Sequence, residues 1–375
     1  MKLHYNKFND NILEVKYEKR NDIFTWGADN LFPYLVEHLI QQSVTTKACV
    51  DKVSKSIYGK SFGDIGNIIV NKDGQTLNEL LRISSREYTK HNNLFIHVGY
   101  NGDLEINSLK VIPAKYMRIG KADDLGYSGK FIIYDNWDRS TGKVLKADFK
   151  VVDRYNPNIK IIQSQIETNK GIQKYKGQVI HIQKDSNSIY SLPDVNPVLS
   201  ETILESNSQL FRSRGSEKGF LNTKLMVVQP FSSQEERSSF KRTLKELRGA
   251  DSSGDVLLLE SSQATDDLGQ QMKMDDLSSP YNDKLFEYSD LQARKNISIA
   301  FGVPLQLIDV SDNSLFGNSG ELLNSAKKQL WEAKEEERDQ IEELFNRLMS
   351  KFVEPLADLK VISPFEQKQT NNEQQ

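Results

Sequence analysis

Two stretches with helical spacing of apolar residues enclose a short mixed segment, and this order constrains the fold more than any other feature. Residues 195–211 carry apolar side chains on one helical face, at Val195, Leu199, Ile203 and Leu210. The other face is nearly uncharged and rich in Ser, Asn and Gln, and residues 285–301 repeat the helical spacing. Two helices that flank an insert can run antiparallel. Their apolar stripes would be exposed to water in a monomer, and packing against further copies of the chain would bury them.

The enclosed segment predicts a small β-α-β module. Residues 223–229 (TKLMVVQ) and 255–260 (DVLLLE) have the composition of short strands. Between them, Ser233 and Glu236 have the spacing of a capping box, and Gly249 ends the helix that they begin. The sequence therefore predicts the order helix, module, helix.

Residues 1–190 predict one α+β domain. Helical spacing indicates helices that begin near Asn30, around Cys49 and at residues 77–91, and LFIHVGYNGDLEI predicts a hairpin with a left-handed turn at Asn101-Gly102. Further strands are predicted at residues 131–134, 144–152, 159–166 and 178–183.

The last part predicts a loop and one long helix. Residues 309–320 (DVSDNSLFGNSG) are polar, without periodicity, and predict an exposed loop. Residues 322–352 keep one apolar stripe, which predicts a single helix of about 30 residues. Residues 363–375 are rich in Gln and Asn and predict a disordered tail.

Composition excludes several classes of protein. The 375 residues include 49 Lys and Arg against 52 Asp and Glu, a net charge of −3, so any DNA contact is expected to be local or weak. The single cysteine, Cys49, is expected to be a buried thiol in a reducing compartment. With no apolar run of about 18 residues and no signal-peptide core, the chain is expected to be soluble with no membrane partner.

Catalytic and metal-binding patterns are missing from the sequence. The five histidines are scattered and the lone cysteine has no partner, so neither a metal nor a cofactor is expected. His97 and His181 alternate with apolar residues and are predicted to be strand residues. Residues 54–61 (SKSIYGKS) lack the first glycine of a phosphate loop. The acid pairs Asp266-Asp267 and Asp275-Asp276 are interpreted as solvated acidic surface.

From VIHIQ (residues 179–183) to Phe352, about half the chain resembles the portal proteins of long-tailed bacteriophages. The resemblance rests on the order of elements, on ISIAFGVPLQLI (residues 297–308) and on the following FGNSGE (residues 316–321). It implies a non-enzymatic ring, usually of about twelve subunits, at one vertex of the virion capsid. Double-stranded DNA would pass through it without sequence specificity. The implied partners are the terminase large subunit, a head-tail adaptor and the major capsid protein, with assembly in the host cytoplasm.

The resemblance also divides the chain into parts. They are the wing (1–190), a stem helix (191–215), the clip (216–280), a second stem helix (281–302), the tunnel loop (303–320), a long wing or crown helix (321–362) and the tail (363–375). Few residues follow Phe352, so a full helical crown is not expected. The tunnel-loop residues expected to face DNA are Asp309, Ser311, Asp312, Asn313, Ser314, Leu315 and Phe316.

Charge is sorted along the clip region. Residues 206–250 contain nine Lys and Arg against four Glu, and residues 251–290 contain ten acids against two Lys. Surfaces of opposite sign suit the docking of a charged partner or another subunit, although solvated charge without a partner is an open alternative. The candidate docking residues are Lys241, Arg242, Lys245, Arg248, Asp251 and Asp255.

Two other classes of function stay open. An α+β enzyme with a dispersed site at His97, His181 and Asp153 would be a monomer or dimer with a concave pocket. A structural oligomer without a channel would associate through the last long helix, so a fragment of residues 320–352 would self-associate.

Overall fold

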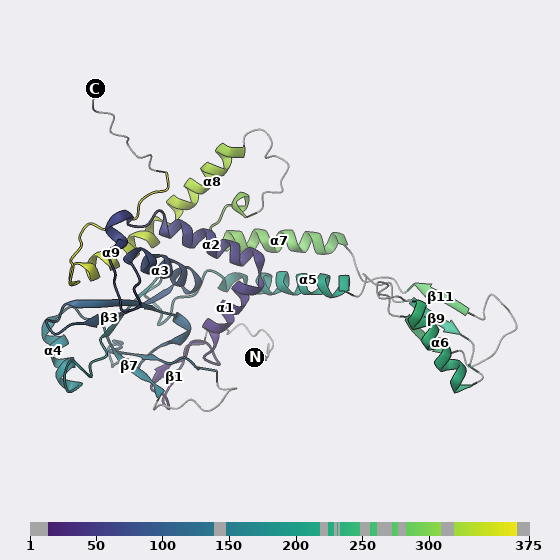
Figure 1. Cartoon of the computed structure of the whole chain (residues 1–375), viewed down its shortest axis with the longest axis horizontal. Coiled ribbons are helices and arrows are strands. Elements are labelled where there is room, and N and C mark those ends of the chain that lie inside the picture. The colour runs from purple at the N-terminus through teal and green to yellow at the C-terminus, as the bar shows by residue number, and fades with distance from the viewer. Residues whose placement is uncertain are drawn as a thin grey trace, which may run out of the picture. The chain divides into compact units, whose positions relative to one another are not determined.

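The computed structural model describes residues 14–138, 148–217, 224–228, 231, 233–247, 256–260, 272–276, 283–308 and 319–365. The chain forms two compact units. The larger contains residues 1–202 and 295–375, and the smaller contains residues 203–294. Helices and a mixed sheet make up the larger unit (Figure 1), so the predicted α+β fold class is confirmed.

Three helices begin the larger unit: α1 (Phe32–Gln42), α2 (Val44–Tyr58) and α3 (Leu77–His91). The Ser43 Oγ accepts a hydrogen bond from Thr46 N at 3.0 Å and so caps α2. Thr76 and Glu79 form a reciprocal capping box at the start of α3. Cys49 lies on the buried face of α2, as predicted.

A six-stranded sheet has the order β4-β3-β8-β7-β6-β5. Only β7 and β8 pair in parallel; the other neighbours are antiparallel. The strands are β3 (Asn93–Tyr100), β4 (Ile106–Ile112), β5 (Met117–Ile119), β6 (Lys130–Ile133), β7 (Lys150–Arg154) and β8 (Gln178–Gln183). Helix α3 packs on β3 and β4, and Phe95 of β3 packs against Trp26 and Phe131. The sheet is therefore central to the core.

Short elements complete this part. A two-stranded sheet joins β1 (Tyr17–Glu18) and β2 (Ile23–Phe24). The 3-10 helices are η1 (Gly63–Asn67), η2 (Ala114–Tyr116), η5 (Asn196–Val198) and η6 (Leu305–Leu307). The predicted hairpin is present as β3 and β4, but its left-handed residue is Leu104, with φ of 66°, and not Asn101 or Gly102. The Asn101 side chain instead accepts from Asp103 N and Glu105 N and thereby shapes the turn.

The strand predicted at residues 159–166 is wrong, because this segment forms helix α4 (Ile159–Thr168). The Asn158 side chain accepts a hydrogen bond from Lys160 N at 3.0 Å and caps the helix. Ile162 is the one buried residue of α4, and Ile159 and Ile161 are exposed. A run of isoleucines suggested a strand, but the cap that precedes it determines a helix.

The single long helix predicted for residues 322–352 is also wrong. The chain forms α8 (Ser319–Ala333) and α9 (Glu335–Met349), with a break at Lys334. The Arg338 Nη1 donates to the Trp331 oxygen at 2.7 Å and satisfies a carbonyl at the end of α8. Three glutamates, residues 335–337, begin α9, where the helix dipole favours negative charge.

The smaller unit contains the predicted β-α-β module. Strand β9 (Lys224–Val228), helix α6 (Gln234–Leu247) and strand β10 (Val256–Glu260) form it, with β9 and β10 parallel. Glu236 N donates to Ser233 Oγ at 3.1 Å, which confirms the predicted cap. A third strand, β11 (Met272–Asp276), pairs antiparallel with β9 and was not predicted. The pair Asp275-Asp276, interpreted as a solvated surface, therefore ends a strand, while Asp266-Asp267 lies outside the described residues.

Candidate functional site: the paired helices and the inserted module

Two long helices lie next to each other along the chain's path into and out of the module: α5 (Leu199–Glu217) and α7 (Asp283–Phe301). An ion pair joins Arg212 Nη2 to Asp290 Oδ2 at 2.5 Å, and Asn296 Nδ2 donates to Glu201 Oε1 at 3.4 Å. Position 212 faces 290, whereas 201 faces 296, so the two helices run antiparallel. This is the arrangement that the sequence allows for two helices around an insert.

One face of α7 carries exposed apolar side chains. Tyr288 is 69% exposed, Leu291 52% and Ile299 67%. Ile299 lies 11 positions after Tyr288, which is about three helical turns, so these side chains form one stripe, which exposed Gln292 and Lys295 interrupt. Large apolar side chains exposed on one side of a helix are typical of a protein interface.

The beginning of α5 is fixed to the larger unit. The Thr202 Oγ1 donates to the Val198 oxygen at 2.9 Å and lies 3.2 Å from Thr46 Oγ1 of α2. Both threonines are buried. The two hydroxyls satisfy each other's hydrogen-bonding capacity near the beginnings of α2 and α5. This contact fixes the first turn of α5.

The Phe301-Gly302-Val303-Pro304 segment has a clear structural role at the end of α7. Gly302 has φ of 66°, its N donates to the Ile299 oxygen at 3.0 Å, and Val303 N donates to the Ser298 oxygen at 2.9 Å. This pair of bonds is a Schellman motif, which favours glycine because the position is left-handed. Phe301 and Val303 are buried. The segment therefore ends the helix and redirects the chain toward η6.

The predicted tunnel-loop residues lie outside the described part of the chain. These are Asp309, Ser311, Asp312, Asn313, Ser314, Leu315 and Phe316. The described chain stops at Ile308 and resumes at Ser319. Ser319 and Gly320, predicted as the end of the loop, form the first turn of α8 instead.

Only some of the predicted docking residues lie in the described part of the chain. Lys241, Arg242 and Lys245 all lie on α6, as their helical spacing requires, and the side chain of Arg242 is exposed. Arg248, Asp251 and Asp255 lie outside the described residues.

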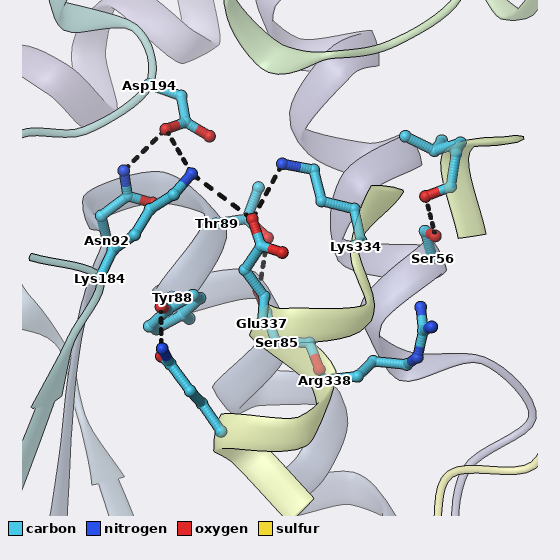
Figure 2. Close-up of polar contacts among 12 residues, drawn as sticks. Ser56, Ser85, Tyr88, Thr89, Asn92, Lys184, Asp194, Lys334, Glu337 and Arg338 are labelled. Atoms are coloured by element: carbon cyan, nitrogen blue, oxygen red, sulfur yellow. Dashed lines mark hydrogen bonds and ion pairs between the residues drawn. The ribbon is translucent and has the colours of Figure 1, made fainter. Parts of the chain in front are cut away.

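A polar cluster, buried at Asn92, Lys334 and Glu337, joins α9 to the sheet region, and no sequence pattern indicated it. Figure 2 shows Glu337 between Lys334 and Lys184, with its Oε1 at 3.0 Å and 3.4 Å from their Nζ atoms. Lys184 also pairs with Asp194 at 3.2 Å, and Asn92 Nδ2 donates to that carboxylate at 2.8 Å. Burial alone would raise the pKa of Glu337, but the two lysines lower it. These contacts hold the start of α9 in place.

A second cluster brings together Glu37, Glu87 and His91, whose potential ligand atoms lie within 4.8 Å of one another. Two ammonium groups already neutralise it: Lys115 Nζ lies 2.8 Å from Glu37, and Lys90 Nζ lies 2.6 Å from Glu87. A metal ion would have to displace both lysines. The geometry therefore favours an ion-pair network over metal binding.

The three residues of the alternative enzyme site, His97, His181 and Asp153, lie on three strands of one sheet. Their surroundings are those of residues that support the fold. His181 is stacked on Phe95 with centroids 4.3 Å apart, and burial lowers its pKa to about 3. The His97 Nε2 lies 2.6 Å from the Lys176 oxygen, and burial lowers its pKa as well. Burial raises the pKa of Asp153. Both imidazoles are neutral near pH 7 and packed in the sheet, which agrees with their prediction as strand residues.

Comparison with known proteins identifies the fold. A chain in the neck of the empty gene transfer agent (GTA) particle, computed with C6 symmetry, matches with a TM-score of 0.54 and 12% identity over 87% of this chain and 83% of the other. A chain in the neck of the native particle, computed with C12 symmetry, matches with a TM-score of 0.51 and 12% identity over 84% and 78%. The fold of this chain is thus that of a chain of the particle neck, and the predicted likeness to portal proteins is confirmed as a likeness of fold.

An HK97 family phage portal protein from Corynebacterium diphtheriae also aligns, with a TM-score of 0.38 and 8% identity over 73% of this chain and 78% of the other. A score of that size does not establish a shared fold. No protein-family model matches the sequence, and no curated protein matches it. Among the helices of the described residues, none has the length and apolarity needed to cross a bilayer.

Proposed function

We propose that this chain is a portal subunit, without catalysis of its own, whose copies form a ring through which double-stranded DNA is packaged and ejected. The observation that carries the proposal is the fold shared with chains of the GTA neck over more than four fifths of this chain. Those chains belong to a neck with C12 symmetry and to a virion, which supports a ring of about twelve copies in a virus-like particle.

The exposed stripe of α7 supports assembly. Tyr288, Leu291 and Ile299 leave a large apolar surface in contact with water when the chain is alone. Packing against another copy removes this surface from water, which stabilises the assembly by about 25 cal/mol for each Å² of apolar surface buried. In the assembled ring, α5 and α7 are the stem helices, the module from β9 to β11 is the clip, and the larger unit is the wing.

The proposal assigns two contacts that depend on particular residues. The loop that contains Asp312, Asn313 and Phe316 faces the DNA channel, where acidic and small polar groups hold DNA weakly because they neutralise no phosphate. The clip docks the terminase large subunit and the head-tail adaptor. Arg242 of α6, together with Lys241 and Lys245, provides the positive charge for that contact.

The experiment is assembly of the purified protein, measured by mass photometry and by negative-stain microscopy viewed along the particle axis. The wild type is expected to form rings with a central hole. Leu291→Glu should reduce assembly by at least about tenfold, because it buries a charge in the interface. Leu125 is also an exposed leucine, 83% exposed between β5 and β6, so Leu125→Glu is the matched control and should assemble normally. Monomers or dimers at every concentration would contradict the ring.

The channel and docking assignments have separate tests. Deletion of residues 311–318 should leave ring assembly intact and abolish DNA packaging in an in vitro packaging reaction. Lys241→Glu combined with Arg242→Glu should weaken terminase binding while the thermal midpoint stays near that of the wild type. Normal packaging by the deletion variant would remove the role assigned to the loop.

A further inference from the structure

A pocket in the larger unit has no role in the proposed function. Its volume is about 490 Å³, and it lies between α2, η6, α8 and residues 364–365 near the end of the described chain. Its lining includes the apolar side chains of Leu307, Leu330, Trp331 and Phe365. Leu307 and Leu330 are buried, whereas Phe365 is 38% exposed, so the apolar part of the pocket extends from the surface into the core.

Three lysines line the same pocket: Lys52 and Lys55 on α2 and Lys327 on α8. No acidic residue is among its lining residues, and within the described ranges none of these three lysines forms an ion pair. The adjacent Lys328 differs, because its Nζ lies 3.8 Å from Glu332. The pocket therefore combines an apolar interior with three positive charges that no described residue neutralises through an ion pair.

The walls of the pocket are held in place. The Arg338 guanidinium lies over the Trp331 ring, with Cζ 3.5 Å from the centroid. Gly59 approaches the other walls so closely that a Cβ there would lie 2.9 Å from Trp331 Cζ3 and 2.7 Å from the Ile362 oxygen. Lys60 N donates to the Ile362 oxygen, and Ile362 N donates to the Ser61 oxygen, each at 2.9 Å. A binding partner would thus meet a preformed site, which lowers the entropic cost of binding.

We propose that this pocket binds an acidic peptide segment of a partner protein that inserts one aromatic or aliphatic side chain. The apolar lining takes the anchor residue, and Lys52, Lys55 and Lys327 pair with carboxylates on either side of it. The pocket volume suits one large side chain with its neighbours. A DNA duplex offers phosphates to the lysines but no apolar side chain to the interior, so the lining favours a peptide over nucleic acid. The site does not depend on ring formation or on DNA passage.

Tryptophan fluorescence gives a direct measurement on the full chain. Trp26 and Trp137 are 0% and 1% exposed, so Trp331 is the tryptophan whose surroundings a ligand can change. The probes are three acidic hexapeptides without Trp or Tyr, Asp-Glu-Phe-Leu-Asp-Glu and its counterparts with Ile-Leu or Phe-Met at the centre. At least one should cause a saturable change in emission. The peptide with Ser-Ser at the centre should bind at least about tenfold more weakly, because it lacks the apolar anchor.

Charge reversal locates the site. Lys55→Glu combined with Lys327→Glu should weaken peptide binding at least about tenfold, whereas Lys328→Glu, one position away but outside the pocket, should change it by less than about twofold. Circular dichroism and the thermal midpoint show that each variant is folded. Three results would overturn the proposal: no saturable change with any of the three peptides, equal effects of the two charge reversals, or tighter binding of a 20-base-pair duplex than of every peptide.

Discussion

Arg118 donates hydrogen bonds to both oxygens of Asn30, from Nε to Oδ1 at 2.5 Å and from Nη2 to the main-chain oxygen at 2.6 Å. Its Nη1 donates to the Met117 oxygen at 2.6 Å. Asn30 itself has a positive φ of 64°, and its Oδ1 also accepts from Trp26 N. Burial lowers the pKa of Arg118 to about 10, so the guanidinium is still charged near pH 7. This buried cation joins Asn30, two residues before α1, to strand β5.

Substitution of Asn30 separates the loss of the acceptor from backbone strain. Asn30→Gly removes the Oδ1 acceptor of a buried guanidinium and should lower the free energy of unfolding by about 2 kcal/mol. Asn30→Ala keeps a Cβ at this left-handed position without the side-chain amide that helps Asn adopt it, and should cost about 1 kcal/mol more than Asn30→Gly. Urea unfolding followed by circular dichroism measures both values. Equal stability of the two variants would show that the positive φ carries no strain.

Gly59 is required by its conformation and by close contacts. Gly59→Ala places a Cβ at a φ of 55°, 2.7 Å from both the Ile362 oxygen and Val361 Cγ1. We expect a loss of at least about 3 kcal/mol in the free energy of unfolding, because a backbone oxygen cannot move aside cheaply. Gly74 is the matched control, with φ of 75° and nothing within 4 Å of an added Cβ. Gly74→Ala should cost only about 1 kcal/mol, so similar losses at the two sites would contradict the steric explanation.

The Glu37 carboxylate should make the free energy of unfolding depend on pH in the acidic range. Burial alone would raise its pKa, but His91, Lys115 and Lys90 lower it from 4.5 to about 2. Since the folded pKa lies below the unfolded value, the stabilisation is fully present above about pH 4.5 and is lost as the pH falls toward about 2. Glu37→Gln should therefore cost on the order of 3 kcal/mol near pH 7 and much less near pH 2.

Chemical denaturation across this pH range tests the Glu37 prediction. The control is Asp73→Asn, which removes an exposed ion pair with Lys110, where Asp73 Oδ2 and Lys110 Nζ lie 2.7 Å apart. An exposed pair contributes less than about 1 kcal/mol. A loss for Glu37→Gln that is the same near pH 7 and near pH 2 would show that the effect is not linked to ionisation.

His181 should destabilise the fold in mild acid. Burial and the charge of Arg154 lower its pKa from 6.5 to about 3. The unfolded chain binds this proton more readily, so stability falls as the pH drops below about 6.5, with a slope of up to about 1.4 kcal/mol per pH unit. His181→Gln should remove this slope between about pH 6 and pH 4. Titration of the His181 ring by NMR near pH 6.5 would contradict the prediction.

The elements predicted correctly have their determinants close together in the sequence. Strand β8 has the predicted limits, residues 178–183, and the cap formed by Ser233 and Glu236 begins α6. The resemblance at residues 297–308 is explained by a local motif, because the Gly302 turn needs a left-handed residue. Periodicity, caps and turn glycines act within a few residues, so they are visible without a structure.

The sequence predictions are wrong or incomplete where distant residues or a side-chain cap decide the conformation. Strand β11 has the sequence MKMDD, which lacks a strand pattern, and its pairing with β9 supplies what the local sequence does not. Helix α4 contains a run of isoleucines that is typical of a strand, and the Asn158 cap that precedes it is the local signal for a helix. Of the candidate sites, the charged cluster of Lys184, Asp194 and Glu337 could not be predicted, since these charges are far apart in the sequence and follow no motif.

The antiparallel pairing of α5 and α7 has a consequence for evolution. Because Arg212 contacts Asp290, the chain leaves for the module and returns from it at neighbouring positions. An insertion of almost any length or fold can occupy that point without changing the path of the remaining chain. Recombination between related genes could therefore exchange the segment between these helices as one cassette, while the rest of the polypeptide is inherited intact.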